Sequence, residues 1–221
     1  MPGLTVLPRT GGARGGDSDA EPSDKVTSAT NEKRMTRSSD DARNKNMIRH
    51  FTATGFVVHN NATLLHWHRK VQEWLPPGGH VDPNEDPVQT TLREIKEETG
   101  FDVEIVPTQP PIVIGNLDQI HAPHSIMIED VVDKKHGEHQ HIDHIYFTQL
   151  TGDKTTATDE HPDASVGWLW ATLTDLQNAT AFQTPTGENR PPPEDVLKLG
   201  TAAIQHVSST GSVRTQRSLG N

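Results

Sequence analysis

The stretch from Gly79 to Phe101, GHVDPNEDPVQTTLREIKEETGF, decides the fold of this chain. It follows the pattern G-x5-E-x7-R-E-U-x-E-E-x-G-U without a mismatch, where U is a bulky apolar residue. Asp86 and Pro87 are typical helix-start residues, since the first turn favours acids and tolerates proline. Gly100 is typical of the position just beyond a helix end. The pattern therefore predicts one short helix between these positions.

Two faces of the expected helix can be distinguished by spacing. A buried apolar stripe is predicted at Val88, Leu92 and Ile95. Another face, roughly opposite, holds Glu94, Glu97 and Glu98. Like charges at this spacing destabilise a helix by a few tenths of a kcal/mol per pair, and a hard divalent cation reverses the sign of that interaction. Mg²⁺ takes oxygen ligands and shares its site with substrate phosphates. The alternative is a solvated acidic face, but the complete pattern with its glycines favours a metal site.

The segment resembles the signature box of the Nudix hydrolases, which cleave nucleoside diphosphates linked to another moiety. The stretch Trp74–Val81 is similar to the strand that leads into the box in many members. Trp168–Trp170 and the following Thr174–Leu176 are similar to their late strand and short helix. The resemblance extends over roughly residues 50 to 205. It implies an α/β fold, a Nudix-type α/β/α sandwich with a mixed sheet.

The resemblance also implies roles for individual residues. The principal metal ligands would be Glu94, Glu97 and Glu98, with Mg²⁺ as the cofactor and Mn²⁺ able to substitute. Glu94 is also a candidate for deprotonating or orienting the attacking water, and Arg93 would orient a box carboxylate by a charge-assisted hydrogen bond. Three further candidates are Gly79 as a ligand through its carbonyl, Glu85 as an outer ligand or a residue that supports the ligands, and Glu138 as a ligand from outside the box.

Histidine is concentrated in one part of the chain, since six of the 13 histidines lie between His121 and His144. His139, His141 and Asp143 alternate at period two, so in a strand they would share one face. Imidazole and carboxylate together suit a transition metal or a phosphate-binding wall. The H-x-H-x-D stretch also resembles a subset of bacterial Nudix sequences, where it borders the active cleft. These residues are therefore candidate substrate-binding groups. A polar strand edge with satisfied histidines is an equally good interpretation.

Composition divides the chain into three parts. Only 31% of the 221 residues are hydrophobic and 5% aromatic. Residues 1–46 contain no aromatic residue and many Gly, Ser and Asp, which predicts a disordered N-terminal leader. Residues 47–207 are expected to form the Nudix hydrolase domain, and residues 208–221 a polar C-terminal tail. The strands and helices expected in the domain are Gly55–His59, Thr63–Trp67, Phe101–Val106, Ser125–Val132, His141–Leu150, the Trp168 strand and a helix from about Pro192.

Charge and cysteine content limit the partners. The formal net charge is −10, and the acidic excess lies outside the leader. This argues against a general nucleic-acid-binding surface and suits a cation-dependent enzyme. No apolar run approaches the roughly 20 residues that cross a bilayer, no signal-peptide pattern is present, and the chain has no cysteine. A cytoplasmic protein with a small nucleotide-type substrate and no membrane partner is expected, and a homodimer is left open.

The expected function is divalent-metal-dependent hydrolysis of a phosphoric anhydride bond in a nucleoside diphosphate linked to another moiety. A non-catalytic Nudix-fold ligand-binding or sensor domain is the alternative, but it would usually show eroded box carboxylates. An isopentenyl diphosphate isomerase of the same fold would need a catalytic cysteine. The substrate stays unresolved. Leu117, Asp118 and Gln119 stand where ADP-ribose and dinucleoside polyphosphate hydrolases carry a marker proline or tyrosine.

Overall fold

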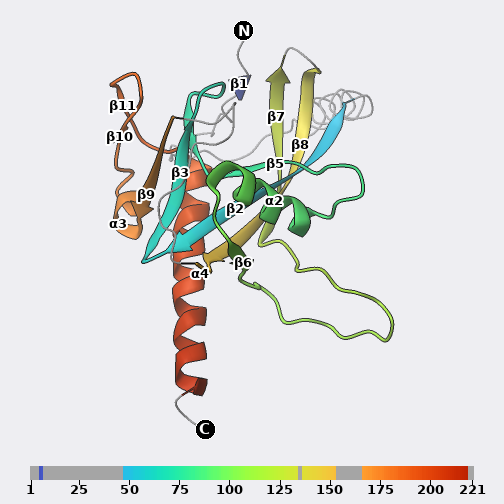
Figure 1. The fold of residues 1–221 in the computed structure, drawn as a ribbon. Coiled ribbons are helices and arrows are strands. Elements are labelled where there is room, and N and C mark those ends of the chain that lie inside the picture. The colour runs from blue at the N-terminus through green and yellow to red at the C-terminus, as the bar shows by residue number, and fades with distance from the viewer. Residues whose placement is uncertain (1–4, 7–46, 134–135, 153–165, 219–221) are drawn as a thin grey trace, which may run out of the picture.

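A computed structural model describes residues 5–6, 47–133, 136–152 and 166–218 of the chain. The strands of the main sheet are β1 (Thr5–Val6), β2 (Arg49–His59), β3 (Ala62–His68), β4 (Glu73–Leu75), β5 (Gly78–His80), β6 (Val103–Ile105), β7 (Ser125–Asp133), β8 (Gly137–Leu150) and β9 (Val166–Thr172). A small second ribbon consists of β10 (Phe182–Gln183) and β11 (Asn189–Arg190). The helices are α2 (Pro87–Thr99), α3 (Leu173–Gln177) and α4 (Glu194–Ser218). Figure 1 shows α2 and α4 against a strongly twisted sheet.

The main sheet is mixed, as the sequence predicts. Its nine described strands run in the order β1-β7-β8-β2-β3-β4, while β5 pairs with β2, β6 with β8 and β9 with β3. The central pair, β2 and β8, is parallel over ten consecutive register positions from Arg49↔Gln140 to Val58↔Gln149. The other pairs are antiparallel. Strands far apart in the sequence therefore meet at the centre of the fold.

The predicted hairpin between β2 and β3 is confirmed. Val58 pairs with Thr63 and His59 with Ala62 across a two-residue turn. The turn residues Asn60 and Asn61 have φ values of 48° and 60°. Asparagine is one of the few residues that adopt this left-handed conformation readily, and a two-residue turn of this kind matches the twist of the flanking strands.

Two apolar cores lie on the two faces of the sheet. Phe56 and Phe147 pack with Ala203 and Ile204 of α4 in the larger core. Val57, the neighbour of Phe56 on β2, packs instead with Ile95 of α2 in the smaller core. Because successive strand residues point to opposite faces, α2 and α4 cover opposite sides of the sheet. The predicted α/β/α sandwich is confirmed.

The described residues include an element near each end of the chain. Thr5 and Val6, which fall in the expected disordered leader, pair with Val132 and Val131 of β7. The edge of β7 that faces away from β8 has backbone groups free to pair with an extended segment, and β1 takes this place. The rest of the leader, residues 1–4 and 7–46, lies outside the described residues. At the other end, α4 continues to Ser218 through much of the expected polar tail.

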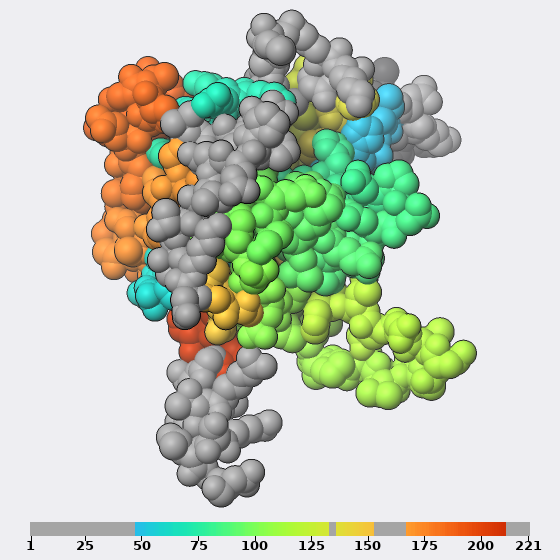
Figure 2. Space-filling model, viewed as in Figure 1, coloured from blue at the N-terminus to red at the C-terminus, as the bar shows by residue number. Residues whose placement is uncertain are grey.

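The connection from β6 to β7 projects from the body of the protein (Figure 2). It exposes several apolar side chains, namely Ile112, Val113, Ile114, Leu117 and Ile120. Leu117, Asp118 and Gln119, which stand where some Nudix hydrolases carry a marker residue, therefore belong to an exposed loop. Among the described residues, no helix has the length and apolar character needed to span a membrane.

Candidate active site

Helix α2 is fixed at both ends by the groups that the sequence predicts. The Asp86 side chain accepts hydrogen bonds from the backbone N–H of Val88 and of Gln89, at 2.8 and 3.0 Å. The Gln89 side chain in turn accepts from the backbone N–H of Asp86 at 3.0 Å, which completes a capping box. Gly100 ends the helix with φ at 70°, and its N–H donates to the Lys96 carbonyl. The local sequence thus determines where the helix that carries the glutamates begins and ends.

The predicted buried stripe of α2 is wrong in part. Of Val88, Leu92 and Ile95, only Ile95 is fully buried, and the other buried residues are Thr90, Thr91 and Thr99. Thr91 and Thr99 tolerate burial because their hydroxyls donate to backbone carbonyls one turn earlier. The face formed by Thr91 and Ile95 contacts Gly55 of β2, where an added Cβ would lie 2.5 Å from Ile95 Cδ1.

Because the buried face of α2 is not the predicted one, the glutamates also lie differently with respect to it. At about 100° per residue, Glu98 lies beside Thr91 and Ile95 rather than opposite the buried stripe, and Glu94 is next to Glu98. Glu94 and Glu98 are therefore partly buried, while Glu97 is exposed. The exposure of the three carboxylates therefore differs, with Glu94 and Glu98 nearer the sheet and Glu97 toward the solvent. The two inner ones are held at the edge of the buried face.

Arg93 holds several acidic side chains at once. Its Nε and Nη2 donate to the two carboxylate oxygens of Glu85, at 2.8 and 2.9 Å. Its Nη1 donates to Glu94 Oε1 at 2.9 Å and to Glu97 Oε2 at 3.2 Å. Nη2 also donates to the carbonyl of His80 at 3.2 Å. Arg93 thus ties the box helix to the end of β5 and positions Glu94.

Both carboxylate oxygens of Glu85 accept hydrogen bonds from Arg93. Besides the two bonds from Arg93, its Oε2 accepts a hydrogen bond from the Thr90 hydroxyl at 2.9 Å. The hydrogen bonds from Arg93 lower the pKa of Glu85 to about 2, with a smaller contribution from Thr90. Of the two roles expected for Glu85, outer ligand or supporting residue, this geometry favours the supporting one, since both oxygens are already engaged.

Glu94 lies directly against Gly79. A Cβ at position 79 would be 2.2 Å from Glu94 Oε1, so any larger residue would displace this carboxylate. Burial raises the pKa of Glu94, while the hydrogen bond and the charge of Arg93 act in the opposite direction. The backbone of β5 and the first inner carboxylate are thus in close contact, as an ion held by both would require.

Glu98 has a buried carboxylate oxygen and a strongly raised pKa. Its Oε2 is buried and has no hydrogen-bond partner in the described part of the chain. Burial, and then the negative charges of Glu94 and Glu97, raise the pKa of Glu98 to about 8, while a hydrogen bond with the backbone of Gly78 opposes the shift. A buried carboxylate oxygen without a partner, next to a second carboxylate, is the arrangement that a bound cation would satisfy.

These donors fit Mg²⁺. Glu94 and Glu98 together with the Gly79 carbonyl offer hard oxygen ligands, and the neighbouring Glu97 is exposed to solvent. Mg²⁺ typically uses one or two carboxylates and keeps several waters. The donor set therefore suits Mg²⁺ or Mn²⁺ better than a metal that prefers nitrogen or sulfur ligands.

The outlying candidate Glu138 is placed elsewhere. In the sheet register, Gly79 is level with Ala53, and Ala53 is level with His144 of β8. Glu138 precedes His144 by six residues, which corresponds to about 20 Å along an extended strand. The register therefore does not bring Glu138 beside the box helix.

The histidine-rich stretch is a strand, as the alternation predicts, and His139, His141 and Asp143 share one face of β8. Asp143 is buried, and its two carboxylate oxygens accept hydrogen bonds from Thr52 and Thr54 of β2, at 3.0 and 2.8 Å. Burial raises the pKa of Asp143, and these hydroxyls oppose the shift. The aspartate is thus engaged with threonines rather than with the two histidines.

His139 and His141 meet a third histidine that the sequence did not reveal. His50 is level with His141 in the parallel β2–β8 pair. The ring centroids of His50 and His139 are 5.0 Å apart. In the sequence, His50 stands alone near the expected start of the domain. Only the register between two distant strands brings it to the other two.

Comparison with known proteins shows the family of the chain. The family model described as NUDIX domain matches residues 49–191. The chain belongs to the Nudix hydrolase family. A crystal structure of a NUDIX-family hydrolase from Clostridium perfringens is similar, with a TM-score of 0.57 and 28% identity over 73% of this chain and 99% of that one. The recognition of the family from the box is confirmed.

Curated relatives match this Nudix chain only in part. A mouse (Mus musculus) bis(5'-nucleosyl)-tetraphosphatase [asymmetrical] is 53% identical over 32 residues, which is 14% of this chain and 22% of that protein. A probable DHNTP pyrophosphohydrolase of Lactococcus lactis is 31% identical over 99 residues, or 45% of this chain and 53% of that protein. The matches thus span between about a fifth and about half of these relatives.

Proposed function

We propose that the chain hydrolyses a phosphoric anhydride bond in a nucleoside diphosphate linked to another moiety, with Mg²⁺ or Mn²⁺ as cofactor. The observation that carries the proposal is the pair of inner carboxylates, Glu94 against Gly79 and Glu98 with a buried oxygen that lacks a partner. A bound cation would neutralise phosphate charge and activate a water molecule.

The residues around the pair have separate tasks in this proposal. Arg93 fixes the direction of the Glu94 carboxylate by the 2.9 Å bond to Oε1, which leaves Oε2 for a ligand or for a proton. Glu85 anchors Arg93 by two parallel bonds. Such a pair restricts rotation of the guanidinium more than a single contact would. Glu94 is the candidate for orienting the attacking water.

Intact carboxylates argue against a non-catalytic ligand-binding or sensor domain. A sensor needs no partly buried glutamates whose burial raises their pKa, since that arrangement costs stability without a cation. Here both inner carboxylates and their arginine are in place. We therefore favour the enzyme over the sensor.

The relatives' names support a nucleotide-type substrate. They include a bis(5'-nucleosyl)-tetraphosphatase, a probable DHNTP pyrophosphohydrolase and an RNA pyrophosphohydrolase, with the match to the last covering 33% of that protein. What these names share is a nucleotide or a pyrophosphate bond. We propose this shared chemistry for the present chain and no single compound.

A turnover screen tests the proposal. Purified protein is incubated with Mg²⁺, with Mn²⁺ or with EDTA, and with a panel of dinucleoside polyphosphates, nucleoside triphosphates, nucleoside diphosphate sugars and 5'-triphosphorylated RNA. Products are separated chromatographically, and Glu94→Gln serves as the matched blank for contaminating activities. We expect at least one compound to be cleaved at the anhydride only with metal and only by the wild type. Equal cleavage by Glu94→Gln, or none across the panel, would remove the support for this function.

A further inference from the structure

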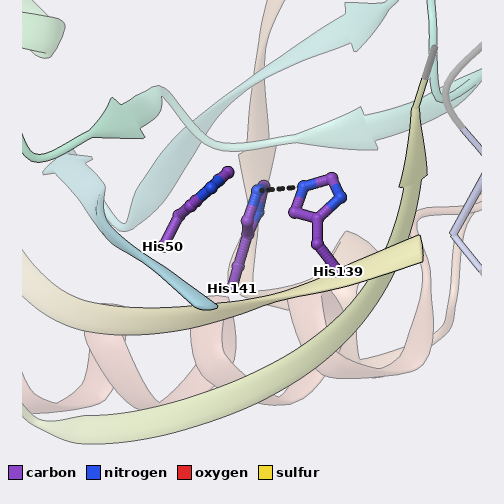
Figure 3. Close-up of side chains that lie close together, drawn as sticks. All are labelled: His50, His139 and His141. Atoms are coloured by element: carbon purple, nitrogen blue, oxygen red, sulfur yellow. Dashed lines mark hydrogen bonds between the residues drawn. The ribbon is translucent and has the colours of Figure 1, made fainter. Parts of the chain in front are cut away.

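Three histidines from two strands converge on one point. The ligand nitrogens of His50, His139 and His141 all lie within 4.8 Å of one another. Figure 3 shows the three rings side by side, rising from the ends of β2 and β8. Since His50 is level with His141 and His139 precedes His141 by two residues, the strand register holds all three on one face. The convergence is thus set by the sheet.

The spacing of two of the nitrogens matches a tetrahedral metal site. His139 Nε2 and His141 Nε2 are 3.3 Å apart. Two nitrogens bound to tetrahedral Zn²⁺ at about 2.0–2.1 Å would be separated by about 3.3–3.4 Å. The rings already stand at nearly the separation that one shared ion would impose.

The tautomer of His139 is also suitable. Its Nδ1 lies 3.0 Å from the carbonyl oxygen of Gly137. A carbonyl oxygen can only accept, so Nδ1 carries the proton and the lone pair of Nε2 points toward His141. Histidines that bind metals commonly donate their other ring N–H to a backbone carbonyl in this manner, which fixes the ring and strengthens the ligand.

The histidines belong to the opposite side of the sheet from the box. On β2, Gly55 contacts Ile95 of α2, whereas Phe56 packs in the core that α4 covers. His50 and Phe56 are six residues apart, an even number, so their side chains point to the same face of β2. The register of β2 with β8 is continuous between them. His50 therefore points away from the face that carries Glu94. The imidazoles form a site of their own rather than an extension of the carboxylates.

We propose that His50, His139 and His141 form a second metal site, selective for a transition-metal ion of the Zn²⁺ type. Imidazole nitrogen suits Zn²⁺, Co²⁺, Ni²⁺ and Cu²⁺ and does not suit Mg²⁺, which takes oxygen ligands. Water completes the coordination. The rings of His136 and His80 lie 4.7 and 5.5 Å from that of His50 and border the site.

The same contacts would also arise if His141 simply donated a hydrogen bond to His139, so the test has to detect the ion itself. Full-length protein is stripped with EDTA and dialysed, and Zn²⁺ binding is then measured by calorimetry and by elemental analysis. Co²⁺ is used in parallel, since its visible absorption distinguishes tetrahedral nitrogen coordination from octahedral oxygen coordination. Neither readout depends on enzymatic activity.

Variants separate this site from the box. His50→Gln and His141→Gln each remove one ligand from a partly buried position. Glu98→Gln removes a box carboxylate, and His144→Gln is the matched control on β8, because His144 lies on the opposite face of that strand. Circular dichroism verifies that each variant is folded. His139 is left unchanged in these variants, because its side chain is fully buried and its substitution would disturb folding.

We expect one Zn²⁺ per chain in the wild type, in Glu98→Gln and in His144→Gln, with a tetrahedral Co²⁺ spectrum. Binding should weaken more than about 100-fold in both His50→Gln and His141→Gln, since loss of even a supporting group around a metal ligand costs 10- to 100-fold. Equal Zn²⁺ affinity in wild type and in folded His50→Gln would overturn the proposal. A site lost only in Glu98→Gln, or a purely octahedral Co²⁺ spectrum, would also overturn it.

Discussion

Gly79 and Glu94 are in such close contact that a single added methyl group would lie 2.2 Å from the carboxylate oxygen Oε1 of Glu94. The contact joins the strand that enters the box to the helix that carries the glutamates. It explains why the first position of the pattern is a glycine even though its backbone does not have a positive φ. Space, rather than backbone conformation, requires glycine here.

Gly79→Ala should therefore inactivate the protein without unfolding it. The alanine methyl would push the Glu94 carboxylate away from its bond with Arg93. We expect kcat/KM to fall by about 100-fold or more, equivalent to at least about 2.7 kcal/mol of transition-state stabilisation. Steady-state kinetics and the melting temperature in EDTA check the two halves of this statement. Activity within a few-fold of wild type would show that the contact does not position Glu94.

Arg93→Lys should show that the guanidinium acts by positioning rather than by charge alone. Lysine keeps the positive charge but cannot hold Glu85 by two bonds and reach Glu94 at the same time. We expect turnover to fall by about 10- to 100-fold, together with a higher Mg²⁺ concentration at half-maximal rate. Lys96→Arg is the matched control on the same helix, because Lys96 is exposed and contacts Asp102. An unchanged Mg²⁺ requirement in Arg93→Lys would contradict the positioning role.

Glu98→Gln should separate metal binding from folding. In the absence of metal, the amide replaces a buried carboxyl whose pKa is raised to about 8, so the variant should melt at the same temperature as the wild type or above it. Millimolar Mg²⁺ should then stabilise only the wild type, since a ligand selective for the native state stabilises it by RT ln(1 + [L]/Kd). Thermal denaturation with and without Mg²⁺ measures both effects. An equal shift in both proteins would place the ion elsewhere.

His66 provides a pH-dependent prediction that does not involve the box. It is buried and stacks on Trp168 with ring centroids 4.6 Å apart. Burial, followed by the charge of His68, lowers the pKa of His66 from 6.5 to about 3. Between these two values the unfolded chain binds one more proton at this position than the folded chain. The stability that His66 confers is therefore complete above about pH 6.5 and is lost as the pH falls toward 3.

We expect His66→Gln to flatten this dependence. In EDTA, the free energy of unfolding of the wild type should fall between pH 6.5 and 5 more steeply than that of the variant, by up to about 1.4 kcal/mol per pH unit. Urea denaturation at a series of pH values gives the two slopes. Above pH 7 the curves should run parallel, with the variant lower because it loses the stacked ring. Parallel curves throughout would mean that His66 titrates normally in the folded protein.

The parts of the fold that follow from local chemistry could be read from the sequence. Asp86, Pro87 and Gly100 delimit α2 because capping depends on residues within one turn of the helix end. The Asn60–Asn61 turn is equally local. The buried face of α2 could not be read in this way, since Thr91 and Thr99 count as polar in a hydrophobic pattern. Their hydroxyls are satisfied by the helix itself, which only the structure shows.

Features that depend on pairing between distant segments could not be predicted from the sequence. The meeting of His50 with His141 follows from the parallel register of β2 and β8, and no local signal specifies that register. The same holds for the threonines that bind Asp143. The box, in contrast, is almost self-contained. This explains why roles for Arg93 and the glutamates could be predicted together from the sequence, while the surroundings of the histidines could not.

The most direct test of the account compares wild type and Glu98→Gln at saturating Mg²⁺, on whichever nucleotide derivative the screen identifies. The substitution removes one carboxylate charge from the box and nearly preserves its volume. We predict that kcat falls by about 1,000-fold or more, corresponding to roughly 4 kcal/mol of barrier, while the circular dichroism spectrum is unchanged. A kcat for folded, metal-saturated Glu98→Gln that is comparable to that of the wild type would contradict a catalytic metal site at this helix.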